Sequence, residues 1–425
     1  MHRVFDNNEI LRRILHRHNL SDDKRNPIAP VLVCTQWSEE YLNILWLRLT
    51  DLKPLLRLFG QLVVSKGKYK LLQKYKNWPT HAAWLRFEKK YQNRIHRLGP
   101  ISNDSALDFG PALDVIFRIK SAGPLLPKLH SLKWDGYSGF GLGEPSGNGL
   151  ANLTVLQIHS TYSAASEIFV GERNLKDITI TSHDPASAAD IRKLLSRIGQ
   201  TCTCVEEVKL TFESNSRELI DKSDVVTFED ITPILRCPGM KWFMLSTACP
   251  ISMDDNDIQK LAESWPSLVS LWLSSRSGRL VLPNRRRLSF KSLIHLAYHC
   301  PCLFYASLYI DDPCIPGPEN LPVFSSPFNF DVGFSPIENP AEIASFLSKL
   351  FPVNFTLWYG VDHFLSEGEH WEDPDLISPN IKGQWSERWA TVESFLPQLI
   401  QMRLDAEKLK QEVARLKIKC EPRWY

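Results

Sequence analysis

The side chains that could bind a metal ion are cysteines at two places in the chain. One pair is Cys202 and Cys204, and the other is Cys300 and Cys302, which follows a histidine. Zinc takes four ligands in a tetrahedron, and a C-x-C spacing fits a single tetrahedral site poorly. Cys237 and Cys300 also hold matching positions, each at a predicted helix end before a proline. The pattern therefore predicts thiols that pack in the core, and it predicts no metal site.

Three further segments carry residues of other chemistries. The glycine-rich segment 138–149 lacks the Gly-Lys-Ser/Thr of a phosphate loop and the G-x-G-x-x-G spacing, so it is interpreted as a loop. Residues 363–370 hold two histidines and two glutamates without an H-E-x-x-H frame. The run NRRR at 284–287 is compatible with nuclear import or phosphate binding, but a solvated turn is favoured. Since no G-x-S-x-G and no thiol-enzyme signature occur, we expect neither catalysis nor a cofactor.

The composition limits the classes of partner. The 425 residues suggest two or three domains, and 43% of them are apolar, which is enough for a core. The 50 basic and 48 acidic residues nearly cancel, so neither a nucleic-acid nor a membrane partner is indicated. No apolar run reaches the ~20 residues of a membrane-spanning helix, and the acidic start MHRVFDNNEI argues against secretion. The nine cysteines lack a framework spacing, which favours a reduced cytoplasmic or nuclear location.

One sequence phrase recurs along most of the chain. It reads x-Leu-x-x-Leu-x-Leu, and its last two apolar positions are two residues apart, so on a strand they point to one face. Its apolar residues are Leu129, Leu132 and Trp134; Leu153, Leu156 and Ile158; Leu175, Ile178 and Ile180; Val205, Val208 and Leu210; Met240, Phe243 and Leu245; Leu268, Leu271 and Leu273; Leu303, Ala306 and Leu308; and finally Leu357 and Tyr359.

The segments between these phrases have helical periodicity, as in DIRKLLSRIG and NPAEIASFLSKLFP. A strand–helix unit of this kind cannot bury its apolar side alone, so the units must stack. The predicted fold class is α/β: a leucine-rich-repeat solenoid shaped as a horseshoe, with parallel strands on the concave face and helices on the convex face. A doubly wound α/β enzyme is the alternative, but it would need a phosphate loop after an early strand, and none is found.

The first fifty residues predict a small all-α domain. A first helix is expected over 5–18, a second over about 27–36, and a third from Ser38, a good N-cap. Leu42, Leu45, Trp46 and Leu49 have helical spacing in the third helix. So small a core cannot hide two tryptophans and this many aliphatic residues.

The same residues resemble an F-box. The resemblance rests on VFDNNEILRRIL followed by APVLVCTQWSEEYLNILWLRL, and it covers about residues 3–49. With the repeats, and with PTHAAWLRFEKKYQNRIHRLG and RWATVESFLPQLIQMRLD, the chain is similar to the F-box/leucine-rich-repeat proteins of mushroom-forming fungi. Val4 and Phe5 stand where that family usually has Leu-Pro.

The resemblance implies a substrate-recognition subunit of a cullin-RING ubiquitin ligase. The F-box would dock on the Skp-family adaptor, and the repeats would hold a protein substrate. Carried over by position, the adaptor surface would be Phe5, Ile10, Leu11, Ile14, Leu15, Val33, Cys34, Trp37, Leu45 and Trp46. Two alternatives stay open: these residues cap the first repeat, or the chain is a repeat scaffold with a degenerate F-box and no ligase role.

A substrate surface is predicted on the strands. Positions flanking the inward leucines are polar in the first half of the repeats and aromatic in the second. Exposed aromatic residues in a concavity are favoured binding anchors. The predicted substrate-binding residues are Trp242, Met244, Trp272, Tyr305, Tyr309 and Trp358. Loops or the C-terminal helix could instead cover them.

Four regions result: an F-box-like domain at 1–50, a helical connector at 51–124, the solenoid at 125–362, and a loop with a C-terminal helix at 363–425. In the connector, Trp84, Phe87, Tyr91 and Ile95 form a helical stripe after a Thr80 cap. In the last region an apolar heptad pattern runs from 395 to 416, which predicts a terminal cap or a short coiled coil.

Overall fold

A computed structural model describes most of the chain. The described residues are 8–20, 32–67, 71–101, 107–120, 123–134, 152–171, 173–182, 186–212, 225–247, 251–273, 286–312, 314–317, 321–325, 327–360 and 379–420. They divide into two compact units, Met1–Ile180 and Thr181–Tyr425. Among the helices in these ranges, none combines the length and the apolar character needed to cross a membrane.

Within the described residues, a long parallel sheet of 11 strands is the main element, and it fits a solenoid-like fold. Its strand order is β1-β4-β6-β7-β8-β9-β10-β11-β12-β13-β14. The strands of this sheet therefore lie side by side in the order in which they occur along the chain. The strands are β1 (Arg48–Leu49), β4 (Arg97–Ile101), β6 (Ser131–Trp134), β7 (Val155–His159), β8 (Asp177–Ser182), β9 (Glu207–Phe212), β10 (Trp242–Leu245), β11 (Ser270–Trp272), β12 (Tyr305–Ser307), β13 (Phe328–Asp331) and β14 (Phe355–Trp358).

The repeated phrase correctly predicted the buried side of β6, β7, β9 and β10. In β12 both sides are buried, Tyr359 lies past the end of β14, and β1, β4 and β13 carry no such phrase. In β9, for example, Val208 and Leu210 are buried while Glu207 and Lys209 between them are only partly covered. The same alternation holds in β7, where Leu156 and Ile158 are buried. Burying one such side chain stabilises the fold by about 1.5–3 kcal/mol, so the stacked repeats supply most of the core.

The first unit contains more strand than the sequence predicted. Its helices are α1 (Asn8–Leu20), α2 (Thr35–Leu47), α3 (Lys53–Arg57), α4 (His81–Lys90), η3 (Gln92–Arg94), α5 (Gly110–Ile119) and α6 (Tyr162–Ser166). A separate sheet of order β2-β3-β5 is formed by β2 (Leu62–Lys66), β3 (Leu71–Tyr75) and β5 (Leu107–Asp108). The expectation of a purely helical connector is therefore wrong, since the β-branched Val63 and Val64 favour a strand. The long sheet also begins at β1, within the first fifty residues.

The α4 segment of the connector agrees with its prediction in the cap and the first half of the stripe, but the helix ends at Lys90, so Tyr91 and Ile95 lie outside it. The Thr80 side chain accepts a hydrogen bond from the Ala83 backbone N–H at 3.2 Å and caps α4. Trp84 and Phe87 are buried and lie against the ring of Phe59, with the Phe59 and Phe87 centroids 5.0 Å apart. This aromatic cluster forms a compact core between α3 and α4.

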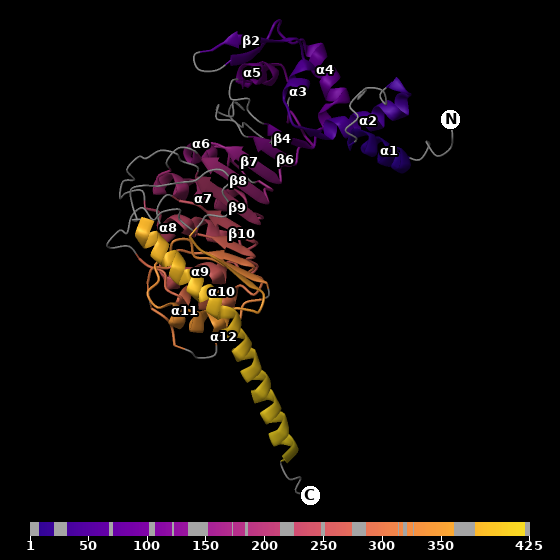
Figure 1. The fold of residues 1–425 in the computed structure, drawn as a ribbon. Helices are drawn as coiled ribbons and strands as arrows, with labels where there is room; N and C mark the ends of the chain where they lie inside the picture. Colours follow the sequence, from indigo (N-terminus) through magenta and orange to yellow (C-terminus); the bar gives the residue numbers. More distant parts are fainter. Residues whose placement is uncertain are drawn as a thin grey trace. The chain divides into compact units, whose positions relative to one another are not determined.

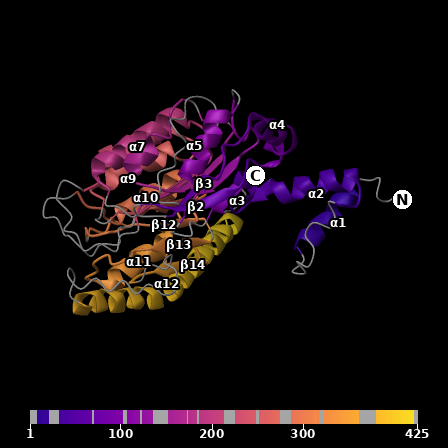
Figure 2. The same cartoon turned by 90° about the horizontal axis from the view of Figure 1, so that it is seen from above.

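In the second unit, helices form a layer against strands β9 to β14 (Figures 1 and 2). They are α7 (Ala188–Thr201), α8 (Phe228–Ile231), η5 (Thr232–Arg236), α9 (Asp255–Ser264), α10 (Lys291–His299), α11 (Pro340–Leu350) and α12 (Pro379–Cys420). In α11 the apolar residues at helical spacing, Ile343, Phe346, Leu347 and Leu350, are buried as predicted. In α7 and α9 the buried residues likewise share one face of the helix.

The first half of α12 closes the second unit. Trp389, Val392, Leu396 and Ile400 are buried, and α12 packs on α11. The Trp389 indole N–H donates to the carbonyl oxygen of Ser335 at 2.9 Å. The heptad residues in this part of the helix, Phe395, Leu399 and Met402, are exposed or partly covered, so the cap uses a different face of the helix.

Candidate protein-interaction surfaces

The α1/α2 hairpin, formed by α1 and α2, has a small core of its own. Leu11, Leu15 and Tyr41 form its buried centre, and Trp37, Ile44 and Leu45 pack against them. One ion pair joins the helices: the Arg12 Nε donates to Glu40 Oε2 at 2.7 Å, and Glu40 is almost fully buried. The hydrogen bond to Glu40 raises the pKa of Arg12. The two helices are thus held by both apolar and ionic contacts.

Helix α2 begins earlier than the sequence predicted. Its N-cap is Cys34, whose Sγ accepts a hydrogen bond from the Trp37 backbone N–H at 3.5 Å. The helix then runs through Ser38, the expected cap, to Leu47, and Leu49 lies in β1. Thiols are rare N-caps, which explains why the sequence pattern favoured the serine. Residues 27–31, the first half of the expected second helix, lie outside the described residues, and Thr35 and Gln36 at its other end belong to α2.

The predicted adaptor-binding residues fall into two groups. Ile10 and Ile14 are exposed, at 38% and 40% of their surface, and Val33 is exposed as well. Leu11 and Leu15, one position further along the helix, are buried in the hairpin core and cannot contact a partner, so their assignment to the surface is wrong. Cys34, Trp37, Leu45 and Trp46 are partly covered, and Phe5 lies outside the described residues. Leu32 and Leu47, which were not predicted, add exposed apolar surface.

Trp46 faces the connector of its own unit. Its ring lies 4.7 Å from the ring of Tyr91, centroid to centroid. Arg94 adds polar contacts that no sequence pattern predicted. Its guanidinium donates to the Glu39 backbone carbonyl at 2.9 Å and also binds the Glu39 carboxylate and the Asn43 side chain. Helix α2 is therefore fixed to η3. The exposed apolar residues that remain available for docking are Ile10 and Ile14 of α1 together with Leu32, Val33 and Leu47.

Outward-facing residues on the strands of the second unit form two rows. Strand register aligns Glu207, Trp242, Ser270, Tyr305, Asn329 and Thr356 in one row. It aligns Lys209, Met244, Trp272, Ser307, Asp331 and Trp358 in the next. Five of the six predicted substrate-binding residues lie in these rows, as the two-residue period requires.

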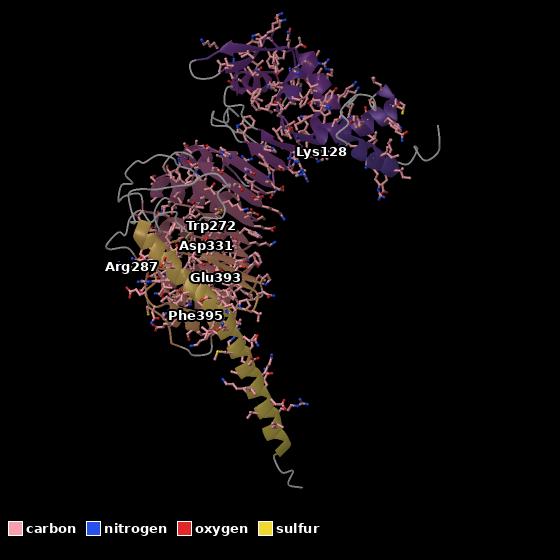
Figure 3. All side chains as sticks on the ribbon, in the orientation of Figure 1. Lys128, Trp272, Arg287, Asp331, Glu393 and Phe395 are labelled. Atoms are coloured by element: carbon pink, nitrogen blue, oxygen red, sulfur yellow. The ribbon has the colours of Figure 1, made fainter. Side chains whose placement is uncertain are left out.

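Asp331 is the polar centre of this face, and no pattern in the sequence predicted it. Its Oδ2 accepts hydrogen bonds from the Tyr305 hydroxyl at 3.1 Å and the Ser307 hydroxyl at 3.2 Å. Its Oδ1 accepts from the Gly333 backbone N–H at 2.9 Å. Trp272 stacks on Tyr305 with 5.6 Å between ring centroids. Trp272 and Asp331 are labelled in Figure 3.

These contacts correct the predicted exposure of the aromatic residues. Trp242 is 39% exposed, but Trp272 is only 6% exposed, and Tyr305 and Tyr309 are buried as well. Met244 and Trp358 are partly covered. The rings of Trp272 and Tyr305 lie on neighbouring strands, where side chains are close enough to cover each other. The open part of the face is therefore at Trp242, Met244 and Trp358.

Of the four cysteines considered as metal ligands, Cys202 and Cys300 are buried, whereas Cys204 and Cys302 are exposed, so the prediction of thiols packed in the core holds for one member of each pair. Cys202 ends α7, Cys237 ends η5 and Cys300 ends α10. The Cys237 Sγ donates to the Cys202 carbonyl oxygen at 3.5 Å, and the Cys300 Sγ donates to the Trp265 carbonyl oxygen at 3.6 Å. Burial raises the pKa of Cys237 to about 11 and that of Cys300 to about 12. These thiols stay protonated at neutral pH, which makes them poor ligands and nucleophiles.

In the basic run at 284–287, the described residues are Arg286 and Arg287. The predicted solvated turn does not account for Arg286, which forms ion pairs with three acidic residues. Arg286 binds Asp254 at 2.6 Å and Asp257 at 2.8 Å, and it also contacts Glu229. Burial raises the pKa of Asp257. Burial also acts to raise the pKa of Asp254, but the hydrogen bonds from Arg286 and from two backbone N–H groups, together with the charge of Arg286, outweigh it, so that pKa is lowered. Opposed shifts in neighbouring carboxylates can mark an acid–base pair. Here, however, both carboxylates bind backbone N–H groups at the start of α9 in a capping box, which is a structural role.

Two other candidates, 138–149 and 363–370, lie outside the described residues. In the ranges that the structure does describe, no group of three or more His, Cys, Asp or Glu side chains is arranged to hold a metal ion. When the chain was compared with protein-family models and with curated proteins, neither comparison found a match.

Proposed function

We propose that this chain is the substrate-recognition subunit of a cullin-RING ubiquitin ligase. In this proposal the α1/α2 hairpin docks on the Skp-family adaptor, and the strand face of the repeats holds the protein to be ubiquitinated. The chain itself would carry out no chemistry, because ubiquitin transfer belongs to the partner subunits of such a ligase. The proposal rests on the F-box-like sequence of the hairpin together with the surface that the hairpin presents.

The observation that carries the proposal is the division of the α1 apolar residues between two faces. Leu11 and Leu15 complete the hairpin core, yet Ile10 and Ile14 are both exposed. These two residues are one helical turn apart, so they lie side by side on one face of α1. Because the core does not need them, an apolar contact with another protein gives them a role. Val33 at the start of α2 adds to the apolar surface of the hairpin.

The parallel sheet supports the second half of the proposal. Its outward rows present Lys209 and Met244 beside the exposed Trp242. An exposed tryptophan flanked by charged and apolar neighbours is a typical anchor for a protein partner. The substrate surface is therefore proposed at β9 and β10, with Trp358 at the far end of the same face.

Binding to the adaptor tests the proposal. The full-length chain should co-elute with a Skp-family adaptor, and Ile10→Gln/Ile14→Gln should weaken binding by about 100-fold or more, because two anchors of at least 1.4 kcal/mol each are lost. Glutamine keeps helix propensity and spares the buried Leu11 and Leu15. The matched control is Tyr298→Gln/Val353→Gln, two exposed apolar residues of the second unit, which should bind the adaptor as the wild type does.

Two results would contradict the proposal. The wild-type chain could fail to bind the adaptor, or the isoleucine variant could bind as tightly as the control. Either result would leave the alternative of a repeat scaffold with a degenerate F-box. Circular dichroism of the variant shows whether the hairpin helices are retained, so a loss of binding can be assigned to the surface rather than to unfolding.

A further inference from the structure

Helix α12 carries two apolar stripes, and only one of them is used by the second unit. The buried stripe is in the first half and includes Trp389, Leu396 and Ile400. The second stripe follows the heptad pattern and consists of Phe395, Leu399, Met402, Ala406, Leu409, Val413 and Leu416. Its distal members are open to solvent: Met402 and Leu409 are each 67% exposed. The two stripes lie on different faces of one continuous helix.

The distal part of α12 extends beyond the rest of the second unit (Figure 1). Every side chain from 405 to 416 is exposed, including Val413 and Leu416. The first half of the helix is fixed, because the Arg403 guanidinium binds the carbonyl oxygens of Ser348 and Phe351. The distal segment therefore continues from an anchored helix, and the cost of starting a new helix does not arise.

The order of residues in the distal stripe matches a two-stranded coiled coil. Val413 and Ala406 hold the a positions of the heptad, while Met402, Leu409 and Leu416 hold the d positions. Among parallel coiled coils, a β-branched residue at a combined with leucine at d favours two strands. The flanking residues Leu396 and Arg403 contact the chain's own body, so pairing with another helix begins at about Met402.

The charges beside the stripe identify the partner and its direction. Asp405 and Glu412 hold the g positions, and Lys410 holds the e position between them. In a parallel dimer, g of one helix meets e five residues further along the other, so Asp405 would meet Lys410 of the second copy. In an antiparallel dimer g meets g, and two acids would face each other. The charges thus suit a parallel pair of identical helices.

The ion pairs within one copy do not compete strongly with this arrangement. Asp405 lies 3.5 Å from Lys408 and Glu412 lies 3.9 Å from Arg415, and all four side chains are largely exposed. Exposed pairs of this kind contribute little to stability. Lys410 forms no ion pair within the described residues, so its ammonium group can bind a carboxylate of another chain.

We propose that residues 402–416 of α12 form a parallel two-stranded coiled coil with a second copy of this chain. The seam is short, so the dimer forms in a concentration-dependent way. The seam uses no residue of the α1/α2 hairpin, so this proposal does not depend on the adaptor-binding proposal.

Sedimentation equilibrium of the full-length chain tests the proposal. We expect the wild type to shift from monomer to dimer as its concentration rises through the micromolar range. Leu409→Lys/Val413→Lys should stay monomeric, because it places charges on the seam. Both residues are exposed and lysine is a good helix former, so each copy should keep its fold. The circular dichroism spectrum of the variant should therefore match that of the wild type.

A charge variant tests the direction of the helices. Asp405→Lys/Glu412→Lys makes every flanking charge positive and should weaken a parallel dimer by at least tenfold. The matched control, Glu387→Lys/Glu407→Lys, makes the same change in charge at exposed positions of α12 outside the seam and should dimerise as the wild type does. A wild type that stays monomeric, or a dimer that survives Leu409→Lys/Val413→Lys, overturns the proposal. A dimer unaffected by Asp405→Lys/Glu412→Lys overturns its parallel arrangement.

Discussion

The two surfaces predicted to bind other proteins differ in how the chain treats its own apolar residues. On the α1/α2 hairpin, Ile10 and Ile14 stay exposed although Leu11 and Leu15 next to them are buried. On the strand face of the second unit, Trp272 and Tyr305 are buried even though they point away from the inner leucines. The hairpin therefore offers more open apolar surface than its small size suggests, and the strand face offers less than its aromatic content suggests.

The difference follows from the neighbours that each element has. The hairpin consists of two helices, so a side chain that points away from the α1–α2 contact has few neighbours to cover it. In the sheet, adjacent strands are about 4.8 Å apart, and large rings on neighbouring strands cover each other. Trp272 stacks on Tyr305, and the Tyr305 hydroxyl is held by Asp331. An outward direction on a strand thus does not guarantee exposure.

The strongest test of this comparison uses two tryptophans of the same sheet. Trp272→Ala should lower the free energy of unfolding by about 3–5 kcal/mol, because a buried ring and its stacking contact are lost. Trp242→Ala should lower it by no more than about 1 kcal/mol, since that ring is exposed. Denaturant unfolding of the full-length chain measures both values. Equal losses for the two variants would show that the burial assigned to Trp272 is wrong.

A smaller effect is expected in the hairpin, where neighbouring residues on α1 form the matched pair. Leu11→Ala should destabilise the hairpin by about 2–3 kcal/mol, because Leu11 lies at the centre of its core. Ile10→Ala should be nearly neutral, since alanine also has the higher helix propensity. Hydrogen exchange of the α1 and α2 amides reports the local stability of the hairpin. Strong deprotection by Ile10→Ala would place Ile10 in the core and remove the basis for the docking surface.

Much of the fold was predictable from the sequence because it follows from short-range periodicity. The two-residue spacing placed Val208 and Leu210 on the buried face of β9, and the helical spacing placed Phe346 and Leu347 in the core. The β2-β3-β5 sheet was missed because its residues 62–66 and 71–75 lack strict alternation, and β2 is largely exposed. Its pairing depends on contacts that no local pattern encodes.

The candidate surfaces were predictable only in part, for a related reason. A helical period indicates which residues share a face, but it cannot say which of two adjacent apolar faces meets a partner helix. Leu11 and Leu15 were therefore grouped with Ile10 and Ile14. The polar network of Asp331 was missed as well, because Tyr305 and Ser307 meet Asp331 only through the register of β12 and β13.

The smallest effect concerns His96, which links the hairpin to the sheet. Its backbone N–H donates to the Leu47 carbonyl at the end of α2, at 3.1 Å, and its carbonyl accepts from the His130 N–H. Burial lowers the pKa of His96, and the nearby charges of His130 and Lys128 lower it further; Lys128 is labelled in Figure 3. In the folded chain, His96 therefore takes up a proton at a lower pH than in the unfolded chain.

This shift makes stability depend on pH in one direction. Above about pH 6.5, the pKa of histidine in the unfolded chain, His96 is neutral in both the folded and the unfolded state. The contribution of neutral His96 to the free energy of unfolding is then fully present. As the pH falls below that value, the unfolded chain binds a proton first, and the contribution is lost until the folded pKa is passed. Wild-type stability should therefore fall more between about pH 7 and about pH 5 than that of His96→Gln. Urea unfolding at both pH values measures the difference, with His81→Gln, an exposed histidine, as control. If the free energy of unfolding fell equally in His96→Gln and in the wild type, the pKa of His96 would not differ between the folded and the unfolded chain.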